Sequence, residues 1–484
     1  MPRGQLWIQV DGGSMAIEEL HGNGDDPSPL GSAFFLSELG PAQIPALQGL
    51  ESRFQALTGS ESAPGLRLGA TTGRFSAEEQ AAFLRLSYGV LGRLTVGATV
   101  PFIRRRVDSL LRLVPDGANV GSNPAFTAPT EVGTFLAASA ATLLALEAAV
   151  DMRCTELGEA HADCVSGRGL VLETDTFLDS VDSAYDEELL FPLAGSSLGD
   201  AVASRWSAIR TGLAAWETDS PEMVPLATDP LDQAMFRTLV LDPAWPDEAF
   251  PIENTPTYLA IGDVELNAAL SLLHPSPAAL EGREIGIRAT LTGGVRFPTG
   301  QPDSLRAVAP LSPPRGVSGF SMGVATDLLL SSHFAVLAHA EGVWNGTREM
   351  ELLAPDPAQL YSPGFTRVNV EWEPGDQRSF GVTPRFHFGP PLSIGAGWQY
   401  VRVEADRFVS LESGGPAVPA LEGPFTFQRV LVEIRYTATA GALADAVRFP
   451  FEVYGRASQT ISGSGEWAPV ERKVEAGLRF LLHR

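Results

Sequence analysis

The side chains of this chain that could take part in catalysis do not fall into a catalytic pattern. Gly319-Phe320-Ser321-Met322-Gly323 matches the G-x-S-x-G nucleophile motif. That motif needs a strand, a sharp turn and a helix, whereas these residues lie inside a segment that alternates apolar and polar residues. The seven histidines join no serine or aspartate in a hydrolytic constellation. We therefore predict no catalytic residue and no enzymatic activity.

The two cysteines, Cys154 and Cys164, are ten positions apart. In an oxidising compartment such a pair is most simply a disulfide. A metal site would need His161 and a fourth ligand that the neighbouring sequence does not supply. We predict a disulfide, and neither a metal nor a cofactor.

Negative charge dominates the chain, with a formal net charge of -24. Residues 107–255 contain 25 Asp and Glu but only six Arg and no Lys, so this segment alone carries -19. Such an acidic protein repels phosphate, which excludes nucleic acid as a partner. The densest acidic cluster consists of Asp175, Asp179, Asp182, Asp186, Glu187 and Glu188. Calcium would suit these carboxylates, but their spacing matches no known loop, and a solvated acidic face is the favoured interpretation.

Outside this segment, charged residues recur at alternate positions of extended segments. The candidates for one inward-facing set are Arg85, Asp263, Glu265, Arg288, Arg296, Asp327, Glu341, Arg385, Arg429, Glu433, Arg435, Arg448, Glu452, Arg456, Lys473, Glu475 and Arg479. Two interpretations remain open. The set forms ion pairs that satisfy buried charge and stiffen a wall, or it lines a polar conduit and selects solutes.

The elements that must position these charges are strands, because apolar and polar residues alternate with period two. The pattern occurs in residues 4–11, 82–90, 94–102, 262–270, 283–298, 320–328, 334–344, 380–388, 392–400, 430–436, 447–457 and 474–482. An even number of strands, here twelve, returns both termini to one side of a membrane, as in bacterial single-chain barrels. In a soluble sandwich the apolar face would instead cover a core.

The connections between these strands favour the membrane barrel. Short and long connections alternate, the longest being 17–69 and 107–255, which is the asymmetry of periplasmic turns and extracellular loops. Aromatic residues gather near both ends of the strands, as they do at the two interfaces of a membrane. No apolar run in the sequence reaches the length of about 18 residues that a membrane helix needs.

The long insertion at 107–255 is expected to be partly helical. Residues 131–152 have helical spacing after Thr130, a candidate N-cap, and a second helix is expected from Ser196 or Ser197 to about Trp216. We expect both helices to be too polar or too short to span a membrane. They could plug the barrel, cover its mouth, or pack on each other as a surface cap tied by the disulfide.

The start of the chain, Met1-Pro2-Arg3-Gly4, leads directly into a strand without an export signal. We interpret the signal as trimmed or the start as misassigned; the third alternative is a protein that is not exported. Twelve amphipathic strands are hard to reconcile with the cytosol, so we predict the bacterial outer membrane.

Three short segments of the sequence resemble segments of known outer-membrane barrels. They are residues 88–97 (Tyr-Gly-Val-Leu-Gly-Arg-Leu-Thr-Val-Gly), 262–266 (Gly-Asp-Val-Glu-Leu) and 296–300 (Arg-Phe-Pro-Thr-Gly). The chain from about residue 80 onward resembles the channel family of phenol meta-pathway degradation, and more distantly the FadL-type transporters of hydrophobic compounds. The resemblance implies a transport channel, but it carries over no binding residue. FadL-type barrels have an N-terminal plug, and this chain opens with a strand instead.

The sequence thus predicts an all-β protein, a transmembrane antiparallel β-barrel of about twelve strands formed by residues 1–106 and 256–484. Residues 107–255 are predicted to form an acidic, partly helical extracellular insertion with a disulfide. The leading functional hypothesis is an outer-membrane channel for passive passage of small solutes, hydrophobic or aromatic ones included. The alternative is a sealed barrel that anchors a surface-exposed binding or structural insertion. The expected partners are outer-membrane lipid and a small-molecule solute.

Overall fold

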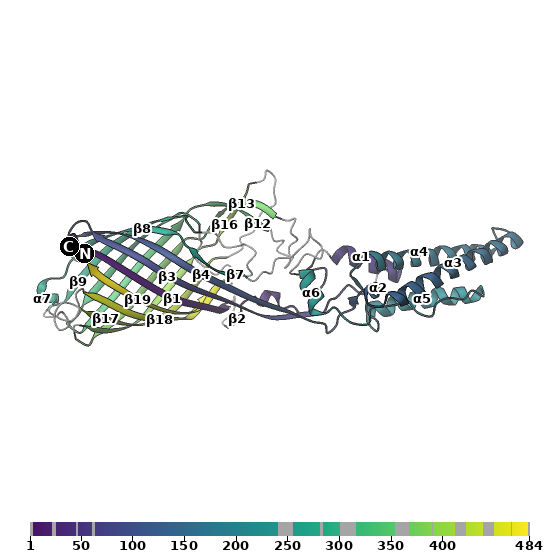
Figure 1. Ribbon diagram of the computed structural model, residues 1–484, viewed down its shortest axis with the longest axis horizontal. Coiled ribbons are helices and arrows are strands. Elements are labelled where there is room, and N and C mark those ends of the chain that lie inside the picture. The colour runs from purple at the N-terminus through teal and green to yellow at the C-terminus, as the bar shows by residue number, and fades with distance from the viewer. Residues whose placement is uncertain are drawn as a thin grey trace.

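The computed structural model contains a closed antiparallel β-barrel of twelve strands (Figure 1). It describes residues 3–482 except 22–25, 45–46, 61–62, 241–254, 281–283, 301–315, 354–366, 390, 412–422, 439–449 and 466. The barrel strands are β1 (Leu6–His21), β3 (Ala70–Gly89), β4 (Leu94–Val114), β8 (Val264–Leu273), β9 (Gly286–Phe297), β10 (Gly319–Leu329), β11 (Phe334–Asn345), β14 (Gln377–His387), β15 (Leu392–Val403), β17 (Phe425–Ala438), β18 (Phe451–Ser464) and β19 (Ala468–Leu482). The predicted fold class and strand number are confirmed.

The barrel closes where the first strand pairs with the last. β1 and β19 are antiparallel, with Leu6 opposite Leu482 and His21 opposite Ala468. Both ends of the chain therefore lie at one end of the barrel, as Figure 1 shows. Two short strands, β2 (Pro27–Pro29) and β7 (Thr255–Ile261), extend the sheet beside β1 and β4.

Several strands are longer than the alternating pattern predicts. β3 begins at Ala70, twelve residues before the predicted start at 82, and β4 continues to Val114 instead of ending at 102. A strand must alternate apolar and polar residues only where one face meets hydrocarbon. Beyond the hydrocarbon layer the backbone pairing continues, but the alternation of apolar and polar residues does not. The sequence pattern alone therefore underestimates the lengths of β3 and β4.

The outer face of the barrel is apolar and exposed. Val432 and Val474 are 57% and 62% exposed although they lie in the middle of paired strands. Aromatic side chains add to this face near the strand ends farther from the termini. There Phe320 stacks on Trp344 with 4.7 Å between ring centroids, and the indole N–H of Trp398 donates to Gln428. An apolar band bordered by aromatic rings with satisfied polar groups is the lipid-facing surface of an outer-membrane barrel.

Two small sheets lie outside the barrel wall. β12 (Arg348–Leu353), β13 (Arg367–Glu373) and β16 (Arg407–Ser410) form one of them, and Figure 1 shows it beside the end of the barrel away from the termini. β5 (Val120–Ser122) and β6 (Leu190–Pro192) form the other, within the insertion. The carboxylate of Asp406 holds the first sheet in place, because it accepts hydrogen bonds from the indole of Trp372 and the backbone N–H of Gly375, both at 2.8 Å. Burial raises the pKa of Asp406 above its ordinary value.

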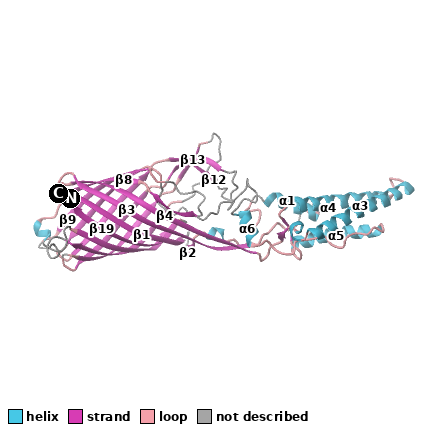
Figure 2. Ribbon diagram, viewed as in Figure 1, coloured by secondary structure: helices cyan, strands magenta, loops and turns pink. Residues whose placement is uncertain are grey.

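Most helices lie beyond the barrel. They are η1 (Ser32–Phe34), α1 (Leu47–Thr58), α2 (Pro124–Thr127), α3 (Pro129–Leu157), α4 (Ala162–Glu187), α5 (Ser197–Ala215) and α6 (Gln233–Val240), while α7 (Pro277–Leu280) lies in the connection between β8 and β9. Figure 2 shows α1, α3, α4 and α5 as a cyan bundle at the end of the molecule opposite the termini. The long strands β3 and β4 lead toward it. The bundle therefore stands outside the barrel, and of the three arrangements expected for the insertion the surface cap describes it best.

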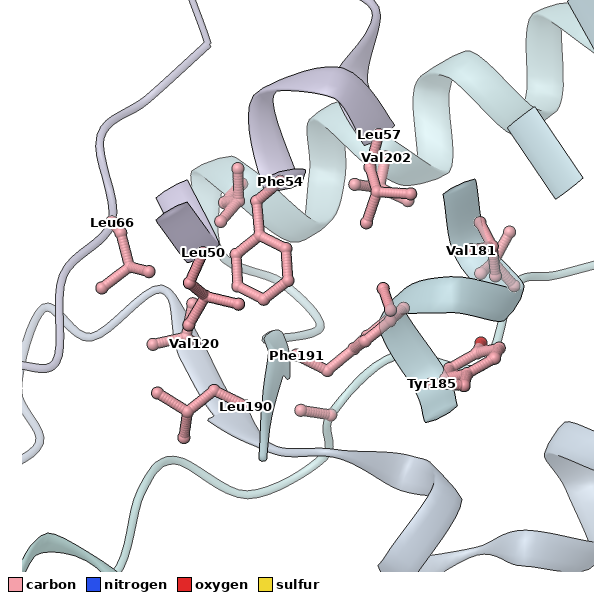
Figure 3. Packing of buried hydrophobic residues seen from close by; sticks show 14 of the residues in the cluster. Leu50, Phe54, Leu57, Leu66, Val120, Val181, Tyr185, Leu190, Phe191 and Val202 are labelled. Atoms are coloured by element: carbon pink, nitrogen blue, oxygen red, sulfur yellow. The ribbon is translucent and has the colours of Figure 1, made fainter. Parts of the chain in front are cut away.

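The bundle has its own hydrophobic core. Phe54 of α1 meets Phe191 edge to face, and Phe191 stacks on Tyr185 of α4 (Figure 3). Trp206 of α5 stacks on Phe177, and its indole N–H donates to the carbonyl of Pro221. The same core cluster reaches Phe75 and Val107 in the extended parts of β3 and β4. The bundle is thus joined to the barrel through these two strands by continuous packing.

One helix was not predicted, and one expectation about the helices was wrong. α4 was not predicted as a helix; it carries Asp175, Asp179, Asp182 and Asp186 at spacings of three and four residues, all on its exposed side. α3 is 29 residues long and is, by length and composition alone, apolar enough to cross a membrane. α3 is rich in alanine, and alanine raises the mean hydropathy of a helix although its side chain is short. α3 lies against α4 and buries a stripe that includes Val132, Phe135 and Leu146.

Candidate functional site

The inner face of the barrel carries charged side chains on one side and small ones on the other. A set that we call the charged wall lies on β1, β3, β14, β17, β18 and β19. Its members are Asp11, Arg85, Arg385, Arg429, Glu433, Arg435, Glu452, Arg456, Glu471, Lys473, Glu475 and Arg479. Their neighbours in each strand, such as Val432 and Ile434, point outward and are exposed. The period-two alternation of the strands therefore places these charges inside the barrel.

Glu433 is the centre of the charged wall. Its carboxylate, only 3% exposed, lies 2.6 Å from Arg385, 2.7 Å from Arg456 and 3.2 Å from Arg435. Three guanidinium groups thus surround one carboxylate. Such a group is stable in a low-dielectric wall only because the hydrogen bonds and the opposite charge offset the loss of water.

A glycine allows this contact to form. Glu475, Arg456, Glu433, Gly395 and Arg385 are successive partners across five neighbouring strands. Because Gly395 has no side chain, Arg385 reaches over it to Glu433, two strands away. A Cβ at Gly395 would lie 3.1 Å from Thr383 and 4.0 Å from Arg385 Nε, so larger side chains would enter the path of the guanidinium group.

A second group of contacts lies closer to the termini. Arg479 donates to Gln9 at 2.6 Å and lies 3.4 Å from Glu452, and Glu452 is also 3.1 Å from Arg435. The hydroxyl of Tyr454 donates to Asp11 at 2.5 Å. These bonds connect β1, the first strand, with β17, β18 and β19, and so they fasten the closure of the barrel.

The opposite inner face is built mainly from small residues. We call the following set the small-residue wall: Thr95, Gly97, Thr99, Ala269, Ser271, Thr290, Thr292, Gly294, Ser321, Gly323, Ala325 and Ala335. Among these residues stand a few long side chains. Arg288 lies 3.2 Å from Asp327 and is 46% exposed, and Glu265 and Glu341 are exposed as well. Inward-pointing side chains can be exposed only where space inside the barrel is unfilled.

Asp263 and Arg296 lie at the end of the barrel away from the termini, apart from the charged wall. Both carboxylate oxygens of Asp263 accept backbone hydrogen bonds, from Gly300 at 2.7 Å and from Gly316 at 2.9 and 3.0 Å. Arg296 donates to the carbonyl of Val317 and to the side chain of Asn345. These two residues hold the described ends of the connection between β9 and β10, around Gly300 and Gly316, against the barrel.

The structure thus divides the predicted inward-facing set. It brings Arg385, Glu433, Arg435, Glu452, Arg456 and Arg479 together in one network, which Glu475 and Lys473 join through Arg456. Arg429 pairs with Glu471, and Arg85 pairs with Asp11. Arg288 pairs with Asp327 among the residues of the small-residue wall. Asp263 and Arg296 bind the described ends of the connection between β9 and β10. Arg448 lies outside the described residues. That the network lines a conduit stays a prediction.

Some members of the network were not among the predicted site residues. Asp11, Gln9 and Tyr454 face the same way as the predicted charges, and Glu471 lies 3.3 Å from Arg429. The alternating pattern of 4–11 would have placed Asp11 and Gln9 inward. Gly395 could not be found this way, because its role depends on the residues of neighbouring strands.

The outer surface also has a hollow. Its volume is about 690 Å³, and its lining includes Leu6, Leu86, Tyr88, Val96, Leu266 and Val295 of β1, β3, β4, β8 and β9. It forms where the outward residues Ala98, Ala268 and Gly293 are small. The hollow is apolar and lies on the lipid-facing side of the small-residue wall.

The predicted disulfide between Cys154 and Cys164 is present, and it joins the end of α3 to the start of α4. Within the described part of the chain, one group of potential metal ligands comes together, formed by these two cysteines and Glu159. Both sulfurs are already bonded to each other. The Gly319–Gly323 segment lies inside β10, paired on both sides, so Ser321 lacks the strand, turn and helix that a nucleophile motif requires.

No family model and no curated protein matches the chain. Among solved structures, an outer membrane channel from Pseudomonas putida F1 matches with a TM-score of 0.44 and 9% identity over 100% of this chain and 97% of that one. The Pseudomonas putida toluene transporter TodX matches with a TM-score of 0.29 and 10% identity, covering 99% and 90%. A FadL homologue of Pseudomonas aeruginosa matches with a TM-score of 0.27 and 8% identity, covering 99% and 89%. Channels of the type that the sequence resembles are thus among the matching structures, but at these scores they assign neither a substrate nor a binding residue to this chain.

Proposed function

We propose that this protein is an outer-membrane channel through which small solutes, hydrophobic or aromatic ones included, pass without energy input. One observation carries the proposal. Inward-facing side chains such as Glu265, Arg288, Thr292 and Glu341 are exposed inside a closed barrel, which requires unfilled space along the small-residue wall. A polar inner face with such space suits a conduit.

The position of the helices supports the same proposal. A sealed anchor would need its interior filled by side chains or by an inserted segment. The bundle of α1, α3, α4 and α5 stands beyond the barrel instead (Figure 1), and the small-residue wall offers little volume to fill the interior. The alternative of a sealed barrel that only anchors the bundle is therefore not favoured.

Conductance in planar lipid bilayers tests the proposal. We expect steady openings of the full-length chain, and we expect Arg288→Ala to change the single-channel conductance because Arg288 lies half exposed on the inner face. Arg106→Ala is the matched control, since Arg106 is exposed and pairs with Asp108 in the outer part of β4. Electrical silence of the wild type would contradict the channel and favour the sealed anchor.

A further inference from the structure

We propose that the charged wall binds the carboxylate of an organic anion whose remaining body is apolar. This inference rests on the proposed channel function and names the class of solute that the channel would favour. Three observations carry it: a surplus of positive charge, aromatic rings placed beside the cations, and the exposure of particular guanidinium groups.

The surplus follows from the composition of the charged wall. Its twelve members include seven cations and only five carboxylates, which leaves two positive charges in excess. Three of these cations share Glu433, and among them Arg435 also pairs with Glu452 and Arg456 lies 3.7 Å from Glu475. Charged groups withdrawn from bulk water require counter-charges, and a solute anion would supply one.

The charges on the small-residue wall also favour an anion that lies against the charged wall. Arg288 there is matched by Asp327, and the other exposed long side chains, Glu265 and Glu341, are acidic. An anion inside the barrel is repelled from these carboxylates and attracted to the charged wall. The small-residue wall leaves it room to lie between the two.

Aromatic rings accompany the cations of the charged wall. The guanidinium of Arg479 lies over Trp7 at 4.9 Å from the ring centroid, that of Arg435 over Tyr454 at 5.6 Å, and that of Arg85 over Phe83 at 5.3 Å. Stacked arginine and aromatic faces bind planar or apolar groups while the guanidinium edge binds a carboxylate. The combination suits an apolar or aromatic carboxylate better than a small inorganic anion.

Exposure identifies the cations that a solute can reach. Within the group around Glu433, Arg385 is 14% exposed and Arg456 is 38% exposed. Arg385 therefore neutralises Glu433 from inside the wall, whereas Arg456 presents part of its guanidinium to the interior. Arg85, 44% exposed, is the corresponding cation nearer the termini. We assign Arg456 as the principal carboxylate-binding residue and Arg85 as the second.

Isothermal titration of the detergent-solubilised full chain tests this assignment with benzoate, benzyl alcohol and inorganic phosphate as probes. Benzoate and benzyl alcohol share the ring and differ in the carboxylate, while phosphate has the charge without the ring. We expect benzoate to bind about tenfold or more tightly than either of the others, since a charged hydrogen bond contributes at least that factor. Equal binding of benzoate and benzyl alcohol, or phosphate binding as tightly as benzoate, would overturn the inference.

Variants locate the site. Arg456→Gln should weaken benzoate binding by about tenfold, and Arg456→Lys, which keeps the charge, should restore part of it. Arg456 can be removed without isolating Glu433, because Arg385 and Arg435 remain as partners. Arg106→Gln, the same change at an exposed position in the outer part of β4, should bind like the wild type. If Arg456→Gln does not fold, as judged by heat-modified electrophoretic migration, Arg85→Gln replaces it with the same expected loss.

The outcomes separate this inference from the proposed function. Benzoate binding that Arg456→Gln abolishes, in a protein without conductance, supports the site and contradicts the channel. Conductance without benzoate binding supports the channel and overturns the site. Unchanged benzoate binding in Arg456→Gln and Arg85→Gln likewise overturns the site.

Discussion

Asp263 accepts a hydrogen bond from the backbone N–H of Gly300 at 2.7 Å, across 37 positions of the sequence. Beside it, the hydroxyl of Thr299 donates to the carbonyl of Gly262 and accepts from the N–H of Val264. The segments Gly262-Asp263 and Thr299-Gly300 are far apart in the sequence, but they bind each other in the structure. A Cβ at Gly300 would lie 2.9 Å from the Asp263 carboxylate, which explains why glycine is needed there.

We expect Asp263→Asn to loosen the connection between β9 and β10. The substituted amide would turn N–H groups toward the N–H donors of Gly300 and Gly316, so at least one of three hydrogen bonds is lost. A hydrogen bond to a charged acceptor contributes about 2 kcal/mol. Hydrogen exchange at the Gly300 and Gly316 amides should therefore accelerate by more than tenfold, while Asp116→Asn, in an exposed turn, leaves it unchanged. Equal protection in both variants would refute the role of Asp263.

We expect Glu433→Gln to destabilise the barrel strongly. The variant removes the one carboxylate shared by Arg385, Arg435 and Arg456, and an unpaired charge in a buried position costs about 3–5 kcal/mol. Urea unfolding in lipid vesicles, followed by tryptophan fluorescence, measures the loss as a lower midpoint. Glu156→Gln, an exposed change in the bundle, controls for the altered net charge. A wild-type midpoint for Glu433→Gln would show that the network contributes little.

We expect Cys154→Ser to destabilise the helical bundle and to leave the barrel intact. The disulfide to Cys164 closes a loop with a sequence separation of 10, which is worth about 3 kcal/mol on the chain-entropy estimate. Thermal loss of the helical circular dichroism should begin at a lower temperature in the variant. A reductant should lower this temperature for the wild type by a similar amount and leave that of the variant unchanged. If a reductant also lowers the temperature for the variant, the loss of stability has a cause other than the disulfide.

We expect the helical bundle to become more stable as the pH falls from neutral toward the acidic range. Burial raises the folded-state pKa of Glu188, and burial with the nearby Asp186 and Asp179 carboxylates raises that of Asp182. Folding then takes up protons between the ordinary pKa and the raised one, so the free energy of unfolding rises as the pH drops through this window. Thermal melting at a series of pH values measures the trend.

Asp182→Asn provides the control for this pH dependence. The amide does not titrate, so the variant should be more stable than the wild type at neutral pH and should respond less to acid. An identical pH dependence in variant and wild type would exclude Asp182 as a contributor.

The strands were predictable because contact with lipid imposes a pattern on every second residue. In β17, Val430, Val432 and Ile434 face outward and Arg429, Glu433 and Arg435 inward, as the alternation required. The pattern is lost where strands leave the membrane, which is why the outer halves of β3 and β4 were missed. α4 was missed because its exposed aspartates interrupt the apolar run, although Phe177, Val181 and Tyr185 are buried at helical spacing.

The charges of the inner face were predictable, but their partners were not. Arg385 and Glu433 are 48 positions apart, and they meet only because Gly395 stands between them in the register of β14, β15 and β17. Register is set by turns and by side-chain packing that sequence alternation does not specify. The sequence therefore indicates which way each charge points, and the structure decides which charges touch.

The length of β3 determines how far the bundle stands from the lipid-facing part of the barrel. A tilted membrane strand needs about 10 residues to cross the bilayer, and β3 has 20. At roughly 3.4 Å per residue, the other half adds on the order of 30 Å of strand between the lipid-facing part of the barrel and the bundle of α1, α3, α4 and α5. The helical tip with its disulfide is thus held clear of the lipid-facing band of the barrel.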